Sequence, residues 1–335
     1  MKKYTHAWLA LKALECLEQK KQNFAPGRKA RAERLLSFMA DYPSTFVRGA
    51  WFPDSIIRDN VDKGAHTWKY TLDGTDKREV RYRPPEHNQC LEAARGELDT
   101  EVGLVEAFSS LPDRCEALSQ GIRDLVLITN KTKSGDVVAF NNSQVALLLL
   151  MLSHYVCDAH VPVHCDARDL YKPSKVHPDL EAFWEKEIKK HYRVSTKTEK
   201  FDLDEMGKLQ RRSKPETFAR SVIAQTEDLV AAAQWEINPS QKSHWRAYLG
   251  KTNKNLWDYM VSVCLVSFHT SLRMFPDKAP YQGQYDTIRI MKDDTLKASV
   301  IAQTPAILAD AITSVAVVWL ATWERWELLA KEHVS

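Results

Sequence analysis

Apolar residues recur at helical spacing along most of this 335-residue chain. Residues three and four positions apart share one face of a helix, whereas the side chains of a strand alternate, so this spacing favours helices over strands. Only 11 glycines interrupt the pattern. We therefore expect an all-α fold, with helices over about 6–20, 28–41, 89–109, 112–129, 143–159, 178–192, 215–235, 254–274 and 303–331.

The composition is that of an ordinary globular protein, with 44% hydrophobic and 27% charged residues. Two connections, about 59–85 and 276–299, are rich in polar and turn residues, but neither resembles a linker between domains. We expect residues 1–335 to form a single domain. The net charge of +3, from 47 basic and 44 acidic residues, excludes an overall polyanion-binding surface, so any contact with nucleic acid has to be local.

The apolar segments and the cysteines indicate in which cellular compartment the protein works. Lys12 and Glu15 interrupt the first apolar segment, so we interpret it as an amphipathic helix and not as a signal peptide. The runs at 145–152 and 312–321 are shorter than the roughly 18 to 20 residues that a membrane-spanning helix needs, and we expect no transmembrane segment. The six cysteines are scattered, as is typical of a reducing compartment. We expect a cytoplasmic protein.

The apolar run at 145–152 leads directly into the segment LSHYVCDAHVPVHCD. His154 and Asp158 lie four residues apart, on one face of the expected helix, and His164 follows the proline at which that helix should end. Ionisable groups on a buried helix need partners or a metal ion to offset their desolvation. The segment therefore predicts a polar site inside a helical core.

A second pair, His177 and Glu181, repeats the four-residue spacing in HPDLE. Nitrogen and oxygen donors of this kind suit zinc, and catalytic zinc sites keep one position open for water. On these residues alone two interpretations stay open. One is a zinc site, and the other is a buried network of hydrogen bonds between histidine and aspartate without metal.

These motifs resemble those of the zinc-dependent phospholipase C and nuclease P-one superfamily, in the order that the family shows. The His-x3-Asp-x5-His core of the family resembles His154, Asp158 and His164, and its later His-x3-Asp/Glu motif resembles His177 and Glu181. The likeness covers most of the chain loosely.

Three further residues that match motifs of the family lie upstream of His154. GAWFPD resembles the Gly-Ala-x-x-Pro-Asp segment of the family and offers Asp54, and the later HTWKY supplies His66. His6 occupies the place of the family's early histidine. The resemblance implies a single compact multi-helix domain with a zinc cluster in a cleft.

The resemblance also implies how two to three zinc ions would be held. The ligands of the first would be Asp54, His66, His154 and Asp158. The ligands of the second would be His164, His177 and Glu181. The ligands of the third would be Asp158, His6 and the terminal amine and carbonyl of Met1.

The chain departs from the family at two positions. Secreted members are processed to begin with tryptophan, whereas this chain begins with Met1, beside a lysine too bulky for removal of the methionine to be expected. His160 is an extra histidine inside the core motif. Two positions beyond Asp158 it points to another face of the helix, so we expect it to play a structural or supporting role.

The resemblance implies a zinc-dependent phosphodiester hydrolase in which a hydroxide bridging two zinc ions attacks in line. Asp54 is the predicted catalytic residue, because it would orient or deprotonate that hydroxide. Three hypotheses follow: a nuclease acting on single-stranded nucleic acid or nucleotides, a phospholipase C that cleaves headgroup phosphate, and a non-catalytic zinc-stabilised binding domain. Glu181 is similar to the phospholipase branch, whereas the short interval from Met1 to His6 is similar to the nuclease branch.

Aromatic residues crowd the same motifs. A ring can stack on a base or hold a quaternary ammonium headgroup, so either substrate suits them. The predicted substrate-binding rings are Trp51, Trp68, Tyr70 and Tyr155. Large rings are also common in cores, and with Trp184 counted we expect at least half of these five rings to be buried.

Overall fold

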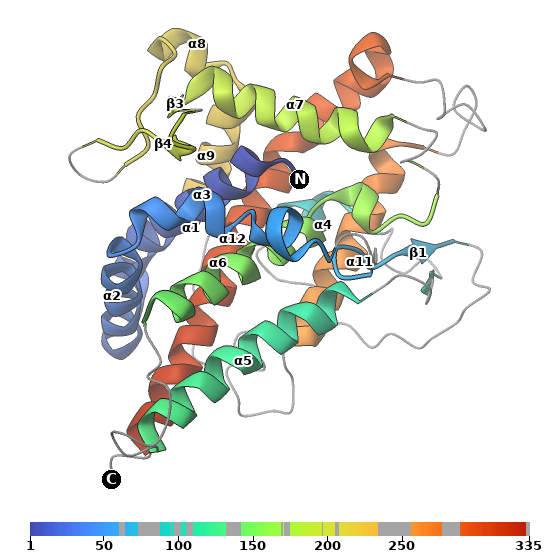
Figure 1. Ribbon diagram of the computed structural model, residues 1–335. Coiled ribbons are helices and arrows are strands. Elements are labelled where there is room, and N and C mark those ends of the chain that lie inside the picture. Colours follow the sequence, from blue (N-terminus) through green and yellow to red (C-terminus); the bar gives the residue numbers. More distant parts are fainter. Residues whose placement is uncertain are drawn as a thin grey trace.

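The helical spacing of the sequence produces helices in the computed structural model (Figure 1). The structure describes residues 1–59, 64–72, 88–94, 96, 102–104, 110–131, 142–168, 170, 175–195, 197–204, 208–233, 256–276 and 289–332. These residues form a mostly helical single domain, which confirms the predicted fold class.

The longer helices carry the fold. They are α1 (Lys3–Lys20), α2 (Pro26–Ala40), α5 (Leu111–Lys131), α6 (Asn142–Ala159), α7 (Val176–His191), α9 (Val222–Ala232), α11 (Leu256–Met274) and α12 (Asp294–Glu332). The short α-helices are α3 (Phe46–Gly49), α4 (Gln89–Ala93) and α8 (Pro215–Ala219). One π-helical turn, η3 (Pro53–Ile57), and four 3-10 turns, η1 (Lys21–Asn23), η2 (Pro43–Thr45), η4 (Pro162–His164) and η6 (Ile290–Lys292), complete the described helical segments.

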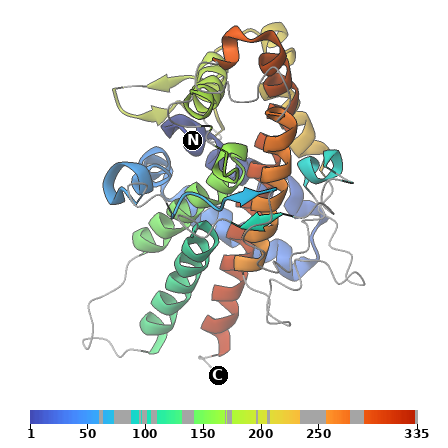
Figure 2. The ribbon, with the colours of Figure 1, turned by 90° about the vertical axis from the view of Figure 1, so that its right-hand side faces the viewer.

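Helix α12 is the centre of the packing. It runs from one end of the molecule to the other in both views (Figure 1, Figure 2). It contacts α1, α2, α4, α5, α6, α9 and α11. By length and composition its segment Asp294–Arg325 could cross a membrane, but 94% of its most apolar window is buried inside the protein, as expected of a core helix.

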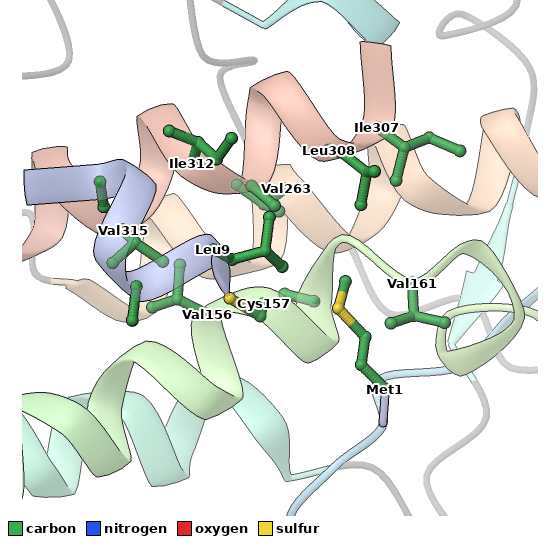
Figure 3. Packing of buried hydrophobic residues seen from close by; sticks show 14 of the residues in the cluster. Met1, Leu9, Val156, Cys157, Val161, Val263, Ile307, Leu308, Ile312 and Val315 are labelled. Atoms are coloured by element: carbon green, nitrogen blue, oxygen red, sulfur yellow. The ribbon is translucent and has the colours of Figure 1, made fainter. Parts of the chain in front are cut away.

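The helices meet in one hydrophobic core. Leu9 of α1, Val156 of α6 and Val263 of α11 pack beside Ile312 and Val315 of α12 (Figure 3). Each of these side chains is at most 1% exposed. Burying one aliphatic side chain of this size stabilises the fold by about 1.5–3 kcal/mol, so the helices that carry the polar site are firmly held.

Two antiparallel pairs of very short strands occur beside the helices. They are β1 (Tyr70–Thr71) with β2 (Gly103–Leu104), and β3 (Val194–Ser195) with β4 (Lys200–Phe201). The backbone N–H groups of Trp68 and Tyr70 donate to the carbonyls of His164 and Cys165, at 3.2 and 2.9 Å. The segment that carries His66 is thereby fixed against the segment that carries His164.

Two predicted helices differ from the observed ones. The range 215–235 is broken between α8 and α9, because Ser221 begins a new helix and its hydroxyl accepts the N–H of Ala224 at 3.1 Å. Among the described residues of the range 89–109, those at 89–93 are helical, Gly96 has a φ of 90°, and 103–104 form β2. Residues 95, 97–101 and 105–109 lie outside the described residues.

The last helix begins earlier than expected. It starts at Asp294, within the predicted connection 276–299, because the carboxylate of Asp293 accepts the N–H of Leu296 at 2.9 Å and so caps the helix. Residues 277–288 of that connection lie outside the described residues.

Candidate metal centre

Helix α6 places the first two predicted ligands on one buried face. His154 and Asp158 are 0% and 1% exposed, and the Nε2 atom of His154 lies 3.2 Å from Oδ2 of Asp158. The Nδ1–H of His154 donates to the carbonyl of Ala50 at 2.7 Å. This bond fixes the tautomer of His154 and directs Nε2 into the site.

Asp54 and His66 lie beside these two donors. Nδ1 of His66 lies 2.7 Å from Oδ2 of Asp158 and 3.2 Å from Nε2 of His154. Oδ1 of Asp54, on the turn η3, lies 3.8 Å from each of the same two ring nitrogens. Four oxygen and nitrogen atoms from three segments of the chain therefore converge.

A second set of donors lies where η4 meets the start of α7. Nε2 of His164 is 3.0 Å from Nε2 of His177 and 3.4 Å from Oε1 of Glu181. Nε2 of His177 is 2.8 Å from the same carboxylate oxygen. The N–H of His177 donates to the carbonyl of Leu170 at 2.9 Å, which anchors the first turn of the helix.

The first residues of the chain face both sets. The amine of Met1 lies 3.1 Å from Oδ1 of Asp158 and 2.8 Å from Oε1 of Glu181. Nε2 of His6 lies 3.5 Å from the same Oδ1, and its ring stacks on His154 with 3.9 Å between centroids. The side chain of Met1 is 4% exposed and points into the hydrophobic core (Figure 3).

Asp158 therefore spans the centre. Its Oδ2 atom faces the histidines at 66 and 154, whereas its Oδ1 atom faces Met1, His6 and Nδ1 of His164, the last at 3.7 Å. Three sets of donor atoms, each with all of its atoms within 4.8 Å of one another, could hold a metal ion: His6–Asp54–His154, His66–His154–Asp158 and His164–His177–Glu181.

The buried carboxylates are held in their charged form. Burial alone would raise the pKa of Asp158 and of Glu181, but the Met1 amine and the nearby histidines outweigh it and keep both pKa values well below the usual range. Burial likewise lowers the pKa of the amine, but the charges of Asp158 and Glu181 raise it to about 11. Asp54 differs, because burial raises its pKa above the ordinary value.

The histidines divide into two groups. Burial lowers the pKa of His66, but the hydrogen bond to Asp158 and its charge outweigh that effect and raise the pKa to about 9. Burial lowers the pKa of His164 to about 4, and burial together with His154 lowers the pKa of His6 well below its ordinary value. His6 and His164 are therefore neutral near pH 7, as metal binding requires.

Some buried ring nitrogens bear on whether a metal ion fits this site. Both ring nitrogens of His6 and Nδ1 of His164 are buried, and no hydrogen bond from any described residue reaches them. Buried polar atoms normally find a partner. Protons on Met1 and His66 can neutralise the carboxylates without metal, whereas a metal ion would also give a partner to one nitrogen of a ring. The donor set therefore fits a metal ion.

The predicted substrate-binding rings lie mostly in the core. Trp68, Tyr70 and Tyr155 are at most 4% exposed, and Trp184 is fully buried. This confirms that at least half of the five rings are buried. Trp51 alone among them is half-buried, and its ring lies 6.0 Å from that of His6. Among these rings, Trp51 is therefore the one that a substrate at the centre could reach.

Two residues of the site had no signal in the sequence motifs. Asp59 accepts a hydrogen bond from His66, and Arg114 lies beside Asp59 from α5. Both become partners of the centre only through the packing of distant segments. His160 is buried and belongs to none of the three donor sets formed by described residues.

Comparison with known proteins adds no relative. No protein-family model, no curated protein and no solved structure matches this chain.

Proposed function

We propose that this protein is a zinc-dependent phosphodiester hydrolase. The observation that carries the proposal is Asp158, whose two oxygens face two different sets of nitrogen and oxygen donors. The carboxylate of Asp158 could therefore bridge two metal ions in a single centre. Paired metal ions are suited to phosphoryl displacement because they stabilise the attacking and the leaving oxygen together.

The spacing of the donors supports zinc. A tetrahedral ion with bonds of about 2.0–2.2 Å keeps its ligand atoms roughly 3.3–3.6 Å apart. The distances that His66 and His154 make to each other, to Asp54 and to Asp158 range from 2.7 to 3.8 Å. Those of the second set range from 2.8 to 3.4 Å. Small shifts of the side chains would complete both sites.

Zinc, Asp54 and Trp51 would then have separate roles in hydrolysis. Zinc, when bound, supplies Lewis acidity and lowers the pKa of water. Asp54 is half-buried and its Oδ1 atom lies 3.8 Å from ring nitrogens of His66 and His154, so its carboxylate would be placed to accept a proton at the centre. Trp51 offers a ring beside the centre, on which a base of a single-stranded nucleic acid could stack.

A phospholipase C is the second candidate. Ile56 and Ile57 follow Asp54 on the same turn and are 69% and 42% exposed, although large apolar side chains are usually covered. An apolar pair beside the centre would suit the acyl chains of a phospholipid. The ring of Trp51 would suit a quaternary ammonium headgroup as well as a base.

A panel of substrates tests the proposal. Zinc-loaded protein is incubated with single- and double-stranded DNA, RNA, mononucleotides and phospholipid vesicles, with His164→Ala as the metal-site control. We expect cleavage of single-stranded nucleic acid that the control and a chelator both abolish. Cleavage of phospholipid alone would favour the second candidate. A protein that binds zinc and cleaves nothing would be a non-catalytic binding domain.

A further inference from the structure

We propose that Asp59, fixed by Tyr155 and Arg114, is a positioning residue that orients the ring of His66 toward the metal centre. This inference rests on the proposed function, because it assigns a supporting role to a residue outside the predicted ligand set. Asp59 lies in none of the donor sets formed by described residues.

The ring of His66 stands between two carboxylates. Its Nδ1 atom faces the centre, 2.7 Å from Asp158 and 3.2 Å from His154. Its Nε2 atom faces the other way, 2.8 Å from Oδ1 of Asp59. If Nδ1 is the metal-binding atom, the proton must sit on Nε2, where it is donated to Asp59.

Asp59 is itself fixed from two helices. Its Oδ2 atom accepts the hydroxyl of Tyr155 on α6 and lies 3.3 Å from Nε of Arg114 on α5. Arg114 also donates to the hydroxyl of Tyr155 at 3.3 Å and lies over its ring, 5.4 Å from the centroid. Because α6 also carries His154 and Asp158, Tyr155 holds Asp59 from the same helix that carries two of the predicted ligands.

The backbone places both aspartates on His66. Arg58 adopts a left-handed conformation, with φ of 58°, and its N–H donates to the carbonyl of Pro53 at 2.8 Å. This turn reverses the chain directly before Asp59, so Asp54 reaches Nδ1 of the ring while Asp59 reaches Nε2. Residues other than glycine rarely adopt this left-handed conformation. Its presence at Arg58 is explained if the turn is needed to place Asp59 beside His66.

A carboxylate on the outer nitrogen has two effects on a histidine ligand. It prevents the ring from rotating, and it makes the inner nitrogen a stronger donor. Removing such a partner typically weakens metal affinity about 10- to 100-fold. Loss of the hydroxyl of Tyr155 should act in the same direction, because it frees Asp59 to turn away.

Metal binding, and not hydrolysis, is the measurement. Co²⁺ is titrated into the unmodified chain and into Asp59→Ala, Asp59→Asn and Tyr155→Phe. Visible absorption is the readout, and competition against a chelator gives the affinity. Asp124→Asn is the matched control, since Asp124 also pairs with an arginine on α5, Arg123, but lies outside the site.

We expect Asp59→Ala to weaken one binding event about 10- to 100-fold and to change its absorption band. Asp59→Asn should lose less, because its amide oxygen still accepts the proton on Nε2. In Asp59→Ala the affinity of the second Co²⁺ binding event should be unchanged. The control Asp124→Asn should match the unmodified chain in both binding events. Tyr155→Phe combined with Asp59→Ala should be no weaker than Asp59→Ala alone, because Tyr155 acts through Asp59.

Two outcomes would overturn the inference. Asp59→Ala could match the unmodified chain in affinity and absorption, or the effects of Tyr155→Phe and Asp59→Ala could add. Failure of the proposed function looks different. Protein that binds Co²⁺ as described but cleaves no phosphodiester refutes the hydrolase and leaves the role of Asp59 supported.

Discussion

At the scale of single residues, the centre depends on which side chains keep or lose protons. Burial raises the pKa of Asp54 above its ordinary value, whereas at Asp158 and Glu181 the surrounding cations outweigh burial and keep the pKa values low. The three carboxylates therefore have different chemistry in one site. Asp54 is suited to exchange a proton, and the other two are suited to hold cations.

We expect Asp54→Asn to lower turnover by at least about 100-fold while zinc content falls little. The amide oxygen can still approach a metal ion, but the amide cannot accept a proton. Turnover and bound zinc are measured on the same preparation. Parallel loss of both would make Asp54 an ordinary ligand.

His269, on α11, provides a test of electrostatics away from the centre. It is 1% exposed, and burial lowers its pKa from 6.5 to about 4. Between these values the unfolded chain binds a proton that the folded chain does not, so the free energy of unfolding falls as the pH drops from 6.5 to 4.

Replacing the ring should remove this contribution. In His269→Leu we expect the free energy of unfolding to vary less over that window, by at most about 1.4 kcal/mol per pH unit. Urea denaturation at several pH values measures both slopes. Equal slopes in the two proteins would mean that His269 is protonated alike in the folded and unfolded chain.

At the scale of elements, the close contact between α3 and α6 sets the position of His154. A Cβ atom at Gly49 would lie 2.6 Å from Cδ1 and 3.0 Å from Cβ of Leu150. Only glycine lets α3 approach closely enough for the carbonyl of Ala50 to accept the proton of His154. The contact between Gly49 and Leu150 therefore keeps the proton of His154 on Nδ1 and leaves Nε2 free to face the site.

We expect Gly49→Ala to destabilise the fold by about 1–3 kcal/mol, as overpacking does. Gly121→Ala, within α5, is the control, because nothing lies within 4 Å of its added Cβ. The control should stabilise the fold by about 0.5–1 kcal/mol. Chemical denaturation compares them, and equal stability of the two variants would contradict the packing argument.

Helix α1 brings a terminal amine to the centre. Extra residues before Met1 would convert that amine into an amide and would need space where Met1 is 4% exposed. We expect extended protein to bind about one zinc fewer and to turn over more slowly, with His6→Ala giving the same defect and no further loss in the extended background. Equal zinc content and rate with and without the extension would remove Met1 from the ligand set.

The sequence was most informative where one element holds a whole motif. The spacing of His154 and Asp158 on α6 predicted their shared face, because helix geometry is local. Asp59 could not be predicted, since its partners come from α5 and α6. The prediction that Tyr155 binds substrate failed for a similar reason. Its nearness to the motif in sequence did not show that its ring is buried.

At the scale of the whole molecule, the hydrophobic core and the polar centre contribute separately to stability. We expect the core around α12 to form without metal, whereas the donors would gain stability from a bound ion. A ligand present at about 100 times its dissociation constant adds about 2.7 kcal/mol to the free energy of unfolding. Stability should therefore depend on zinc, and helicity should not.

We expect a chelator to lower the Tm by roughly 5 °C and to leave far-ultraviolet circular dichroism unchanged at 25 °C. Thermal scans with and without added zinc measure this difference. Loss of helicity on chelation would instead show that the fold itself requires the metal.

The central position of α12 has a consequence for biosynthesis. Every predicted metal ligand lies within residues 1–181, yet the helices that carry these ligands pack on a helix that begins at Asp294. The ribosome makes the ligands long before it makes their support, and α1 and α6 emerge with uncovered apolar faces. We infer that the chain closes its core only after α12 leaves the exit tunnel. Metal acquisition would then follow the emergence of α12.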